Sequence, residues 1–178
     1  MIVHYNNLKE IRNKHNMETI VLCKGSFDMF HVGHLNLLKS AKKLGDILVV
    51  IIKSDEAVKL KGLNRPVINE KDRSTIIDAI KYVDYTIIAN ENFNFSNFEQ
   101  FCTSEQDLFK LHRYGKIILD LEPNILLHQE GHKIPDVLLG LYAIAKTKIE
   151  TLPYTDRIST TKIISDNINL YTSLYVSR

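Results

Sequence analysis

Hydrophobic residues fall along the chain into short continuous runs, separated by longer segments in which they recur at helical spacing. Five runs predict β-strands, over Thr19–Cys23, Ile47–Ile52, Tyr85–Ala89, Ile125–Leu127 and Lys148–Leu152. The helical spacing in the intervals predicts α-helices, over Val32–Leu44, Lys71–Tyr82, Val137–Lys146 and Thr160–Ile168. The pattern therefore predicts a chain in which strands and helices alternate.

The longest of the strand-like runs lacks the alternation of apolar and polar residues that a half-exposed strand would show. Ile47–Ile52 is apolar at every position, which is typical of a strand that is covered on both faces. Because strands alternate with helices, we expect right-handed βαβ crossovers and an α/β fold with a doubly wound parallel sheet. Ligands of such sheets bind beside the carboxyl ends of the strands.

The length of 178 residues fits one domain, 1–178, with its core over about residues 19–168. Residues 90–120 depart from the alternating pattern, because a polar stretch with scattered aromatics precedes loosely spaced apolar residues. This segment predicts a loop followed by a helix. The helix either covers the sheet or contributes to a homodimer contact, and both interpretations stay open.

The composition, with 44% hydrophobic and 25% charged residues, is that of an ordinary globular protein. The formal net charge is only +2 and no basic run is interleaved with aromatics, so we expect no nucleic-acid partner. A small anionic ligand needs only a local basic patch. Four residues could supply it: Lys59, Lys61, Arg65 and Arg73.

Two cysteines, Cys23 and Cys102, give neither a disulfide framework nor a metal-ligand spacing, and both fit a reducing compartment. The first residues lack the basic and apolar regions of a signal peptide. No apolar stretch approaches the roughly 20 residues that span a bilayer. We therefore expect a cytoplasmic protein without a membrane partner.

Residues 25–34 join the first predicted strand to the first predicted helix. A strand, a glycine-bearing turn and a helix N-terminus direct free backbone N–H groups and the positive end of a helix dipole at one point, which suits phosphate. His31 and His34, on either side of Gly33, place two imidazoles on the same side of this turn. A histidine pair is more often surface or capping chemistry, but its place directly after a strand favours a functional role.

The turn resembles the His-x-Gly-His signature of the cytidylyltransferase-like nucleotidyltransferase superfamily. Residues 61–73 and 80–84 are similar to the middle of heptose-phosphate adenylyltransferases. Arg157–Ile163 is similar to the closing signature of glycerol-phosphate and ethanolamine-phosphate cytidylyltransferases. The resemblance implies a Rossmann-like fold and transfer of a nucleoside monophosphate from CTP or ATP to a small phosphorylated sugar, polyol or alcohol. Pyrophosphate would leave, and the product would be an activated precursor for surface polysaccharide or lipid.

The resemblance also implies site residues in the turn and in the loop that follows the second strand. His31 and His34 would contact the triphosphate and stabilise the transition state, and Lys61 would reach the phosphates, with Lys59 as a competitor. Asp28 is interpreted as capping the turn, with ligand contact as the alternative. Four turn residues would line the path of the phosphates: Gly25, Ser26, Phe27 and Gly33.

Two further groups would complete the site. Ser159, Thr160 and Thr161 would open the last helix with hydroxyls and backbone amides that face the phosphates, although an ordinary helix cap has the same composition. Arg73 would bind the acceptor phosphate with its guanidinium, the alternative being a surface helix residue. Mg²⁺ would accompany the triphosphate, held mainly by phosphate oxygens.

The chain departs from the family pattern in two places. Tyr154 stands where relatives have Arg, and Arg157 stands where they have Gly, so Arg157 could restore the missing charge as a substrate-binding residue. After the fourth strand, relatives carry Gly-Asp or Gly-Gly-Asp, whereas this chain carries a segment that includes His128, Glu130 and His132. Glu130 could accept a hydrogen bond from an exocyclic amino group of the base. We expect no metal site there, because two-apart spacing at a strand end is common by chance.

The choice between CTP and ATP stays open, since the middle motif resembles adenylyltransferases and the last one resembles cytidylyltransferases. A non-catalytic nucleotide-binding regulatory protein on the same fold is the alternative function, suggested by the substituted segment after the fourth strand. The intact histidine pair and the Ser-Thr-Thr sequence favour the enzyme. The length excludes a class I aminoacyl-tRNA synthetase.

Overall fold

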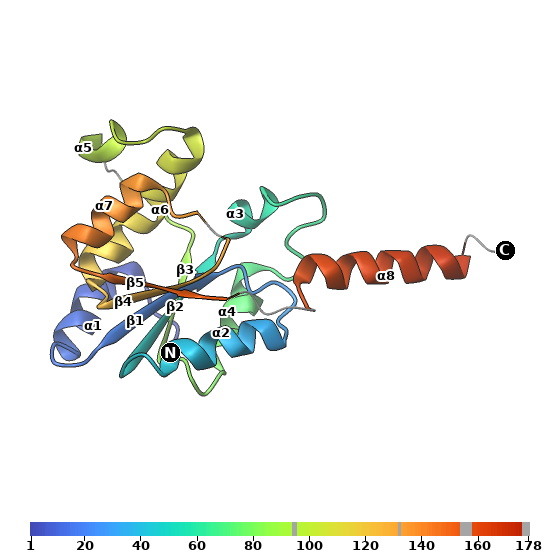
Figure 1. The fold of residues 1–178 in the computed structure, drawn as a ribbon, viewed down its shortest axis with the longest axis horizontal. Coiled ribbons are helices and arrows are strands. Elements are labelled where there is room, and N and C mark those ends of the chain that lie inside the picture. Colours follow the sequence, from blue (N-terminus) through green and yellow to red (C-terminus); the bar gives the residue numbers. More distant parts are fainter. Residues whose placement is uncertain (94–95, 132, 154–157, 176–178) are drawn as a thin grey trace.

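A five-stranded parallel sheet forms the centre of the molecule (Figure 1). The structure is a computed structural model of the chain, and it describes residues 1–93, 96–131, 133–153 and 158–175. The strands are β1 (Ile20–Gly25), β2 (Ile47–Lys53), β3 (Tyr85–Ala89), β4 (Ile125–Gln129) and β5 (Lys148–Leu152). They lie in the order β3-β2-β1-β4-β5, and every neighbouring pair is parallel. The strand order reverses between β1 and β4, which is where sheets of this kind bind ligands.

Helices cover both faces of the sheet, as expected for a doubly wound fold. One core lies between the sheet and a layer that contains η1 (Tyr5–Asn7), α1 (Leu8–Lys14), α6 (Glu105–Leu121) and α7 (Asp136–Ile144). The other core lies under α2 (Val32–Lys42) and α4 (Glu70–Asp78). Side chains of β1 alternate between the two: Leu22 belongs to the first core and Cys23 to the second. The sequence-based prediction of a parallel sheet with two covered faces is confirmed.

The element boundaries differ from the expected ones mainly at the carboxyl ends of the strands. β1 and β4 each continue two residues beyond their apolar runs, and polar residues such as Lys24 and Gln129 therefore lie at the ligand-binding edge. The segment 90–120 contains α5 (Ser96–Glu99) and the long helix α6, which covers the sheet. The apolar spacing did not indicate α1 or the short helix α3 (Asp55–Lys59).

The last helix, α8 (Thr160–Tyr175), is longer than predicted and extends away from the sheet and its helical layers (Figure 1). Only its first turn reaches the carboxyl edge of the sheet, where Thr160 is buried. Within the described ranges, we find no helix that combines the length and the apolar character needed to cross a bilayer.

Candidate functional site

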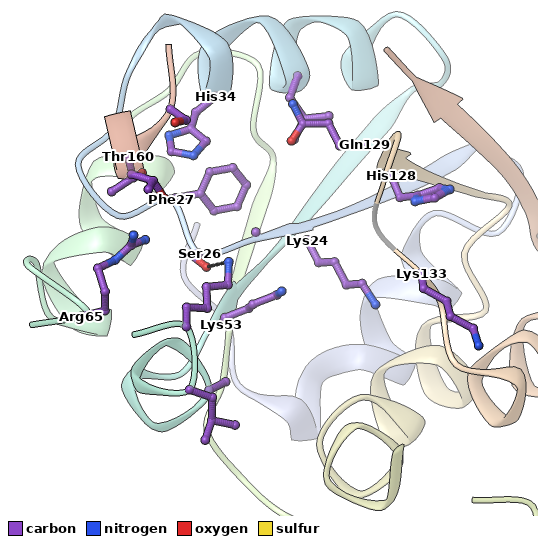
Figure 2. A pocket seen from close by; sticks show the side chains of 18 of the residues that line it. Lys24, Ser26, Phe27, His34, Lys53, Arg65, His128, Gln129, Lys133 and Thr160 are labelled. Atoms are coloured by element: carbon purple, nitrogen blue, oxygen red, sulfur yellow. Dashed lines mark hydrogen bonds between the residues drawn. The ribbon is translucent and has the colours of Figure 1, made fainter. Parts of the chain in front are cut away.

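A cavity of about 540 Å³ opens at the carboxyl edge of the sheet (Figure 2). Five segments that are distant in the sequence line it: the β1–α2 turn, residues 53–65, the start of α6, residues 128–131 with 133–135, and the start of α8. The cavity therefore lies where the strand order predicts a ligand site.

The β1–α2 turn forms one wall of the cavity and has an unusual backbone. Phe27 and Met29 have φ angles of 50° and 49°, in the left-handed region that non-glycine residues rarely adopt. Such conformations cost about 1–3 kcal/mol each and occur most often at functional sites. The ring of Phe27 folds back over Gly25, where an added Cβ would lie 2.8 Å from it, so the turn requires glycine at that position.

The two predicted histidines lie together at the start of α2. Their rings stack with centroids 3.8 Å apart, and the ring of Phe27 lies edge-on to His34 at 5.2 Å. His31 is the N-cap of α2, and its Nδ1 accepts a hydrogen bond from the backbone N–H of Gly33 at 3.2 Å. Because Nδ1 is the acceptor, the neutral ring carries its proton on Nε2, which is left to donate to a ligand.

Both histidines are held in the neutral form. Burial, together with the nearby His31 and Lys61, lowers the pKa of His34 to about 3. Burial also lowers the pKa of His31. At neutral pH the pair therefore offers N–H donors to an anionic ligand rather than two fixed positive charges.

Lys61 approaches the histidines from the opposite wall. It lies in the exposed loop after α3, and its Nζ donates a hydrogen bond to the Ser26 hydroxyl at 2.8 Å. Partial burial, with Arg65 nearby, lowers the pKa of the Lys61 ammonium. Its competitor Lys59 is exposed and does not line the cavity, so the structure brings Lys61, and not Lys59, to the site.

Asp28 connects three of the segments that build the site. Its fully buried carboxylate accepts hydrogen bonds from Arg65 Nε at 2.9 Å and from the backbone N–H groups of Val67 and Ile68. Its backbone carbonyl accepts from Thr160 Oγ1 at 2.7 Å. Asp28 is thus a structural residue, and it ties the loop that bears Lys61 and the start of α8 to the histidine turn.

The start of α8 also follows the sequence-based expectation. Ser159, Thr160 and Thr161 all line the cavity, and the Ser159 hydroxyl accepts a hydrogen bond from the backbone N–H of Lys162 at 3.1 Å. The N-termini of two helices, α2 and α8, therefore open into the same cavity. Such termini favour phosphate groups.

Arg73 does not have the expected role. It is fully buried beneath the turn and does not line the cavity. Its guanidinium donates to the backbone carbonyls of Ser26, Ile68 and Lys53 and pairs with Asp55 at 2.6 Å. These bonds occupy Nε and both terminal nitrogens, so the guanidinium supports the turn and is not free to bind an acceptor phosphate.

Glu130 does not reach the cavity either. It is exposed, and its backbone N–H extends the β4–β5 pairing by donating to Leu152 at 2.9 Å. Its neighbours Gln129 and Gly131 line the cavity instead, together with His128, which contacts Thr151 at 3.1 Å. The position of Glu130 therefore does not support the expected contact with the base.

Three of the residues named from the sequence, His132, Tyr154 and Arg157, lie outside the described residues. Among the residues that are described, no group of three or more His, Cys, Asp or Glu side chains is arranged to hold a metal ion.

Four lysines of the cavity were not anticipated: Lys24, Lys53, Lys110 and Lys133. Burial lowers the pKa of Lys24 to about 8 and that of Lys53 to about 7. A signal was present in the sequence, because Lys24 and Lys53 directly follow apolar strand runs at the edge where ligands bind.

Known proteins are similar to this chain in sequence and in fold. The cytidylyltransferase-like family matches residues 22–166. The bifunctional protein HldE of Desulfatibacillum aliphaticivorans is 35% identical over 150 residues, which cover 83% of this chain and 26% of that protein. The chain thus spans about a quarter of that relative's length.

Two crystal structures show the same fold. A lipopolysaccharide core biosynthesis protein from Thermoplasma volcanium GSS1 has a TM-score of 0.54 and 24% identity, covering 79% of this chain and 99% of that one. Pantoate-beta-alanine ligase from Francisella tularensis has a TM-score of 0.58 and 17% identity, covering 94% and 76%. These likenesses establish a Rossmann-like fold, and the family match extends from β1 into α8. The chain belongs to the cytidylyltransferase-like family.

Proposed function

We propose that the protein is a nucleotidyltransferase that moves a nucleoside monophosphate from CTP or ATP to a small phosphorylated acceptor and releases pyrophosphate. One observation carries the proposal. The neutral pair of His31 and His34, the Lys61 ammonium and the N-terminus of α8 all face a single cavity at the switch point of the sheet. This is a set of donors for a polyphosphate chain.

The chemistry requires no protein nucleophile. A phosphate oxygen of the acceptor attacks the α-phosphorus, the bond from that phosphorus to the bridging oxygen breaks, and pyrophosphate leaves with the electron pair. The residues position two anions and stabilise the charge that grows on the transferred and leaving groups. His31 would donate from Nε2, and Lys61 would move from Ser26 to a phosphate oxygen.

Magnesium fits this cavity as a companion of the triphosphate. None of the described residues that line the cavity is Asp or Glu, so phosphate oxygens would supply the anionic ligands of the ion. The ion would neutralise part of the charge on the leaving pyrophosphate. Lys61 and the α8 N-terminus would bind the same phosphate chain from the protein side.

The acceptor is proposed to be a sugar phosphate in preference to a polyol or amino-alcohol phosphate. The resemblance of residues 61–73 and 80–84 to heptose-phosphate adenylyltransferases supports this choice. The product would then be a nucleotide-activated sugar for a surface polysaccharide or lipid.

A screen tests the proposal directly. Each of the four nucleoside triphosphates is combined with sugar, polyol and amino-alcohol phosphates, and pyrophosphate release is measured. We expect release with CTP or ATP only when an acceptor phosphate is present. Tight triphosphate binding without release by any pair would instead indicate the regulatory protein.

A further inference from the structure

One end of the cavity carries positive charge that the triphosphate does not require. Lys24 and Lys53 extend β1 and β2 by period-two alternation from Leu22 and Ile51, which belong to the core under α6 and α7. The histidine turn packs on the opposite core, where Phe27 lies. Figure 2 shows Lys24 and Lys53 on the side of Ser26 that faces away from His34.

Lys110 of α6 completes this cluster from above the sheet. It lines the cavity four residues before Tyr114, whose ring lies 5.0 Å from the Lys24 ammonium. We call Lys24, Lys53 and Lys110 the lysine cluster. Its members come from three different elements, so the fold itself brings them together.

Asp107, one turn before Lys110 on α6, is the carboxylate that interacts with the charge of Lys110, but no carboxylate of the described residues forms an ion pair with the lysine cluster. None of the described residues that line the cavity is acidic. The charges that act on Lys53 come from Lys61, Lys24 and Lys110, and all of them lower its pKa. Burying an ammonium group without an ion-pair partner costs free energy of folding, and such groups are typical of a site that binds an anionic ligand.

We infer that the lysine cluster binds a second anionic group of the acceptor, so that the acceptor carries a carboxylate or a second phosphate beside its reacting phosphate. This inference rests on the proposed function. The triphosphate is matched by the histidines, Lys61 and α8, and the base and ribose are uncharged. The reacting phosphate must lie near Lys61 to reach the α-phosphorus, which leaves the lysine cluster for another anion.

Matched acceptor analogues test the inference without turnover. Titration calorimetry measures binding of glucose 1-phosphate against glucuronic acid 1-phosphate and glucose 1,6-bisphosphate, and of glycerol 3-phosphate against 3-phosphoglycerate. Within at least one set, the member with the additional anion should bind at least tenfold more tightly. Equal or weaker binding of the doubly anionic member in every set would overturn the inference.

Substitutions of the cluster lysines test whether these residues cause the preference for the doubly anionic acceptor. Lys24→Met and Lys53→Met should each abolish it while changing the affinity for the singly phosphorylated member less than twofold. Lys59→Met, at the exposed end of α3, should retain it. Lys53→Met removes a half-buried charge that Lys61, Lys24 and Lys110 repel, so the variant should also melt at a higher temperature than the wild type. A preference that survives both cluster variants would contradict the assignment.

Proton uptake gives an independent readout. In the free protein the pKa values of Lys53 and Lys24 are about 7 and 8, and a bound anion raises them. Affinity for the doubly anionic probe should therefore fall as pH rises from 7 to 9, with protons taken up on binding. The other titratable groups near the cluster are Lys61, Tyr114, His128 and Lys133, together with Asp107 beside Lys110 on α6.

Calorimetry at pH 8 in two buffers of different ionisation enthalpy counts these protons. No net uptake with the probe that binds best would contradict the inference. Because none of these measurements needs turnover, an inactive protein can still show the preference, and an active one can still lack it.

Discussion

At the scale of single residues, the site depends on histidines that are kept neutral and on an arginine whose nitrogens are all hydrogen-bonded within the protein. His34 is neutral because Phe27, Phe30 and His31 surround its ring. The sequence predicted that His34 and Lys61 would lie at the ligand site, and both line the cavity, because their motifs are local. It misassigned Arg73, since only the fold shows that the guanidinium passes under the turn and is used by backbone carbonyls.

His34→Asn should lower kcat by roughly 10²-fold, in line with loss of one donor to the transition state. The secondary structure should stay native by circular dichroism, because the ring lies at the cavity and not in the core. Steady-state kinetics of pyrophosphate release check this expectation. Turnover close to that of the wild type, in a folded variant, would exclude a catalytic role.

Arg73→Lys should lower the free energy of unfolding by about 3 kcal/mol. A lysine cannot make all the hydrogen bonds of the guanidinium, so buried backbone carbonyls and Asp55 would lose their partners. Urea unfolding followed by circular dichroism measures the change. If Arg73 instead bound the acceptor, the lysine variant would keep its stability and lose affinity for the acceptor alone.

At the scale of elements, the carboxyl ends of the strands and the N-termini of α2 and α8 converge on one cavity. The apolar runs and the helical spacing together predicted all five strands and the helices α2, α4, α7 and α8, most clearly β2, which is apolar at every position except its last. They did not predict α1 or α3, since such short helices are fixed by tertiary packing and capping rather than by a long apolar stripe. The link between Asp28 and α8 spans 132 residues and has no local signal.

Thr160→Val tests that link. The variant keeps the shape of the side chain but removes the hydrogen bond from Oγ1 to the Asp28 carbonyl, which is worth about 1 kcal/mol. Because the start of α8 would then be less well positioned, KM for the triphosphate should rise about fivefold, with a smaller change in kcat. Ser165→Ala, in the second turn of α8 and outside the cavity lining, is the comparison for the loss of a hydroxyl. An unchanged KM for Thr160→Val would show that the contact does not position the helix.

At the scale of the whole molecule, the cavity joins two cationic ends with no acidic lining residue among those described. The family could be predicted from the sequence because its three motifs, in the histidine turn, in residues 61–84 and before α8, are each continuous along the chain. The lysine cluster could not, since it is assembled from β1, β2 and α6 only when the sheet and its helical cover have formed.

A requirement for magnesium is expected because the described cavity lining has no acidic residue, so the ion would bind through the phosphate oxygens of the triphosphate. We expect no pyrophosphate release in excess chelator and full recovery on addition of Mg²⁺, with the metal requirement following the triphosphate concentration. Full activity in the presence of the chelator would show that the lysines and helix termini neutralise the phosphates without an ion.

The measurement that tests the central claim most directly follows two isotopic labels through one reaction. The protein is incubated with a triphosphate labelled on the α- or the γ-phosphate and with the acceptor that the screen selects. The α-label should appear in the acceptor product and the γ-label in pyrophosphate, and His31→Asn with His34→Asn should suppress both. A γ-label on the acceptor, or release of labelled inorganic phosphate alone, would contradict nucleotidyl transfer.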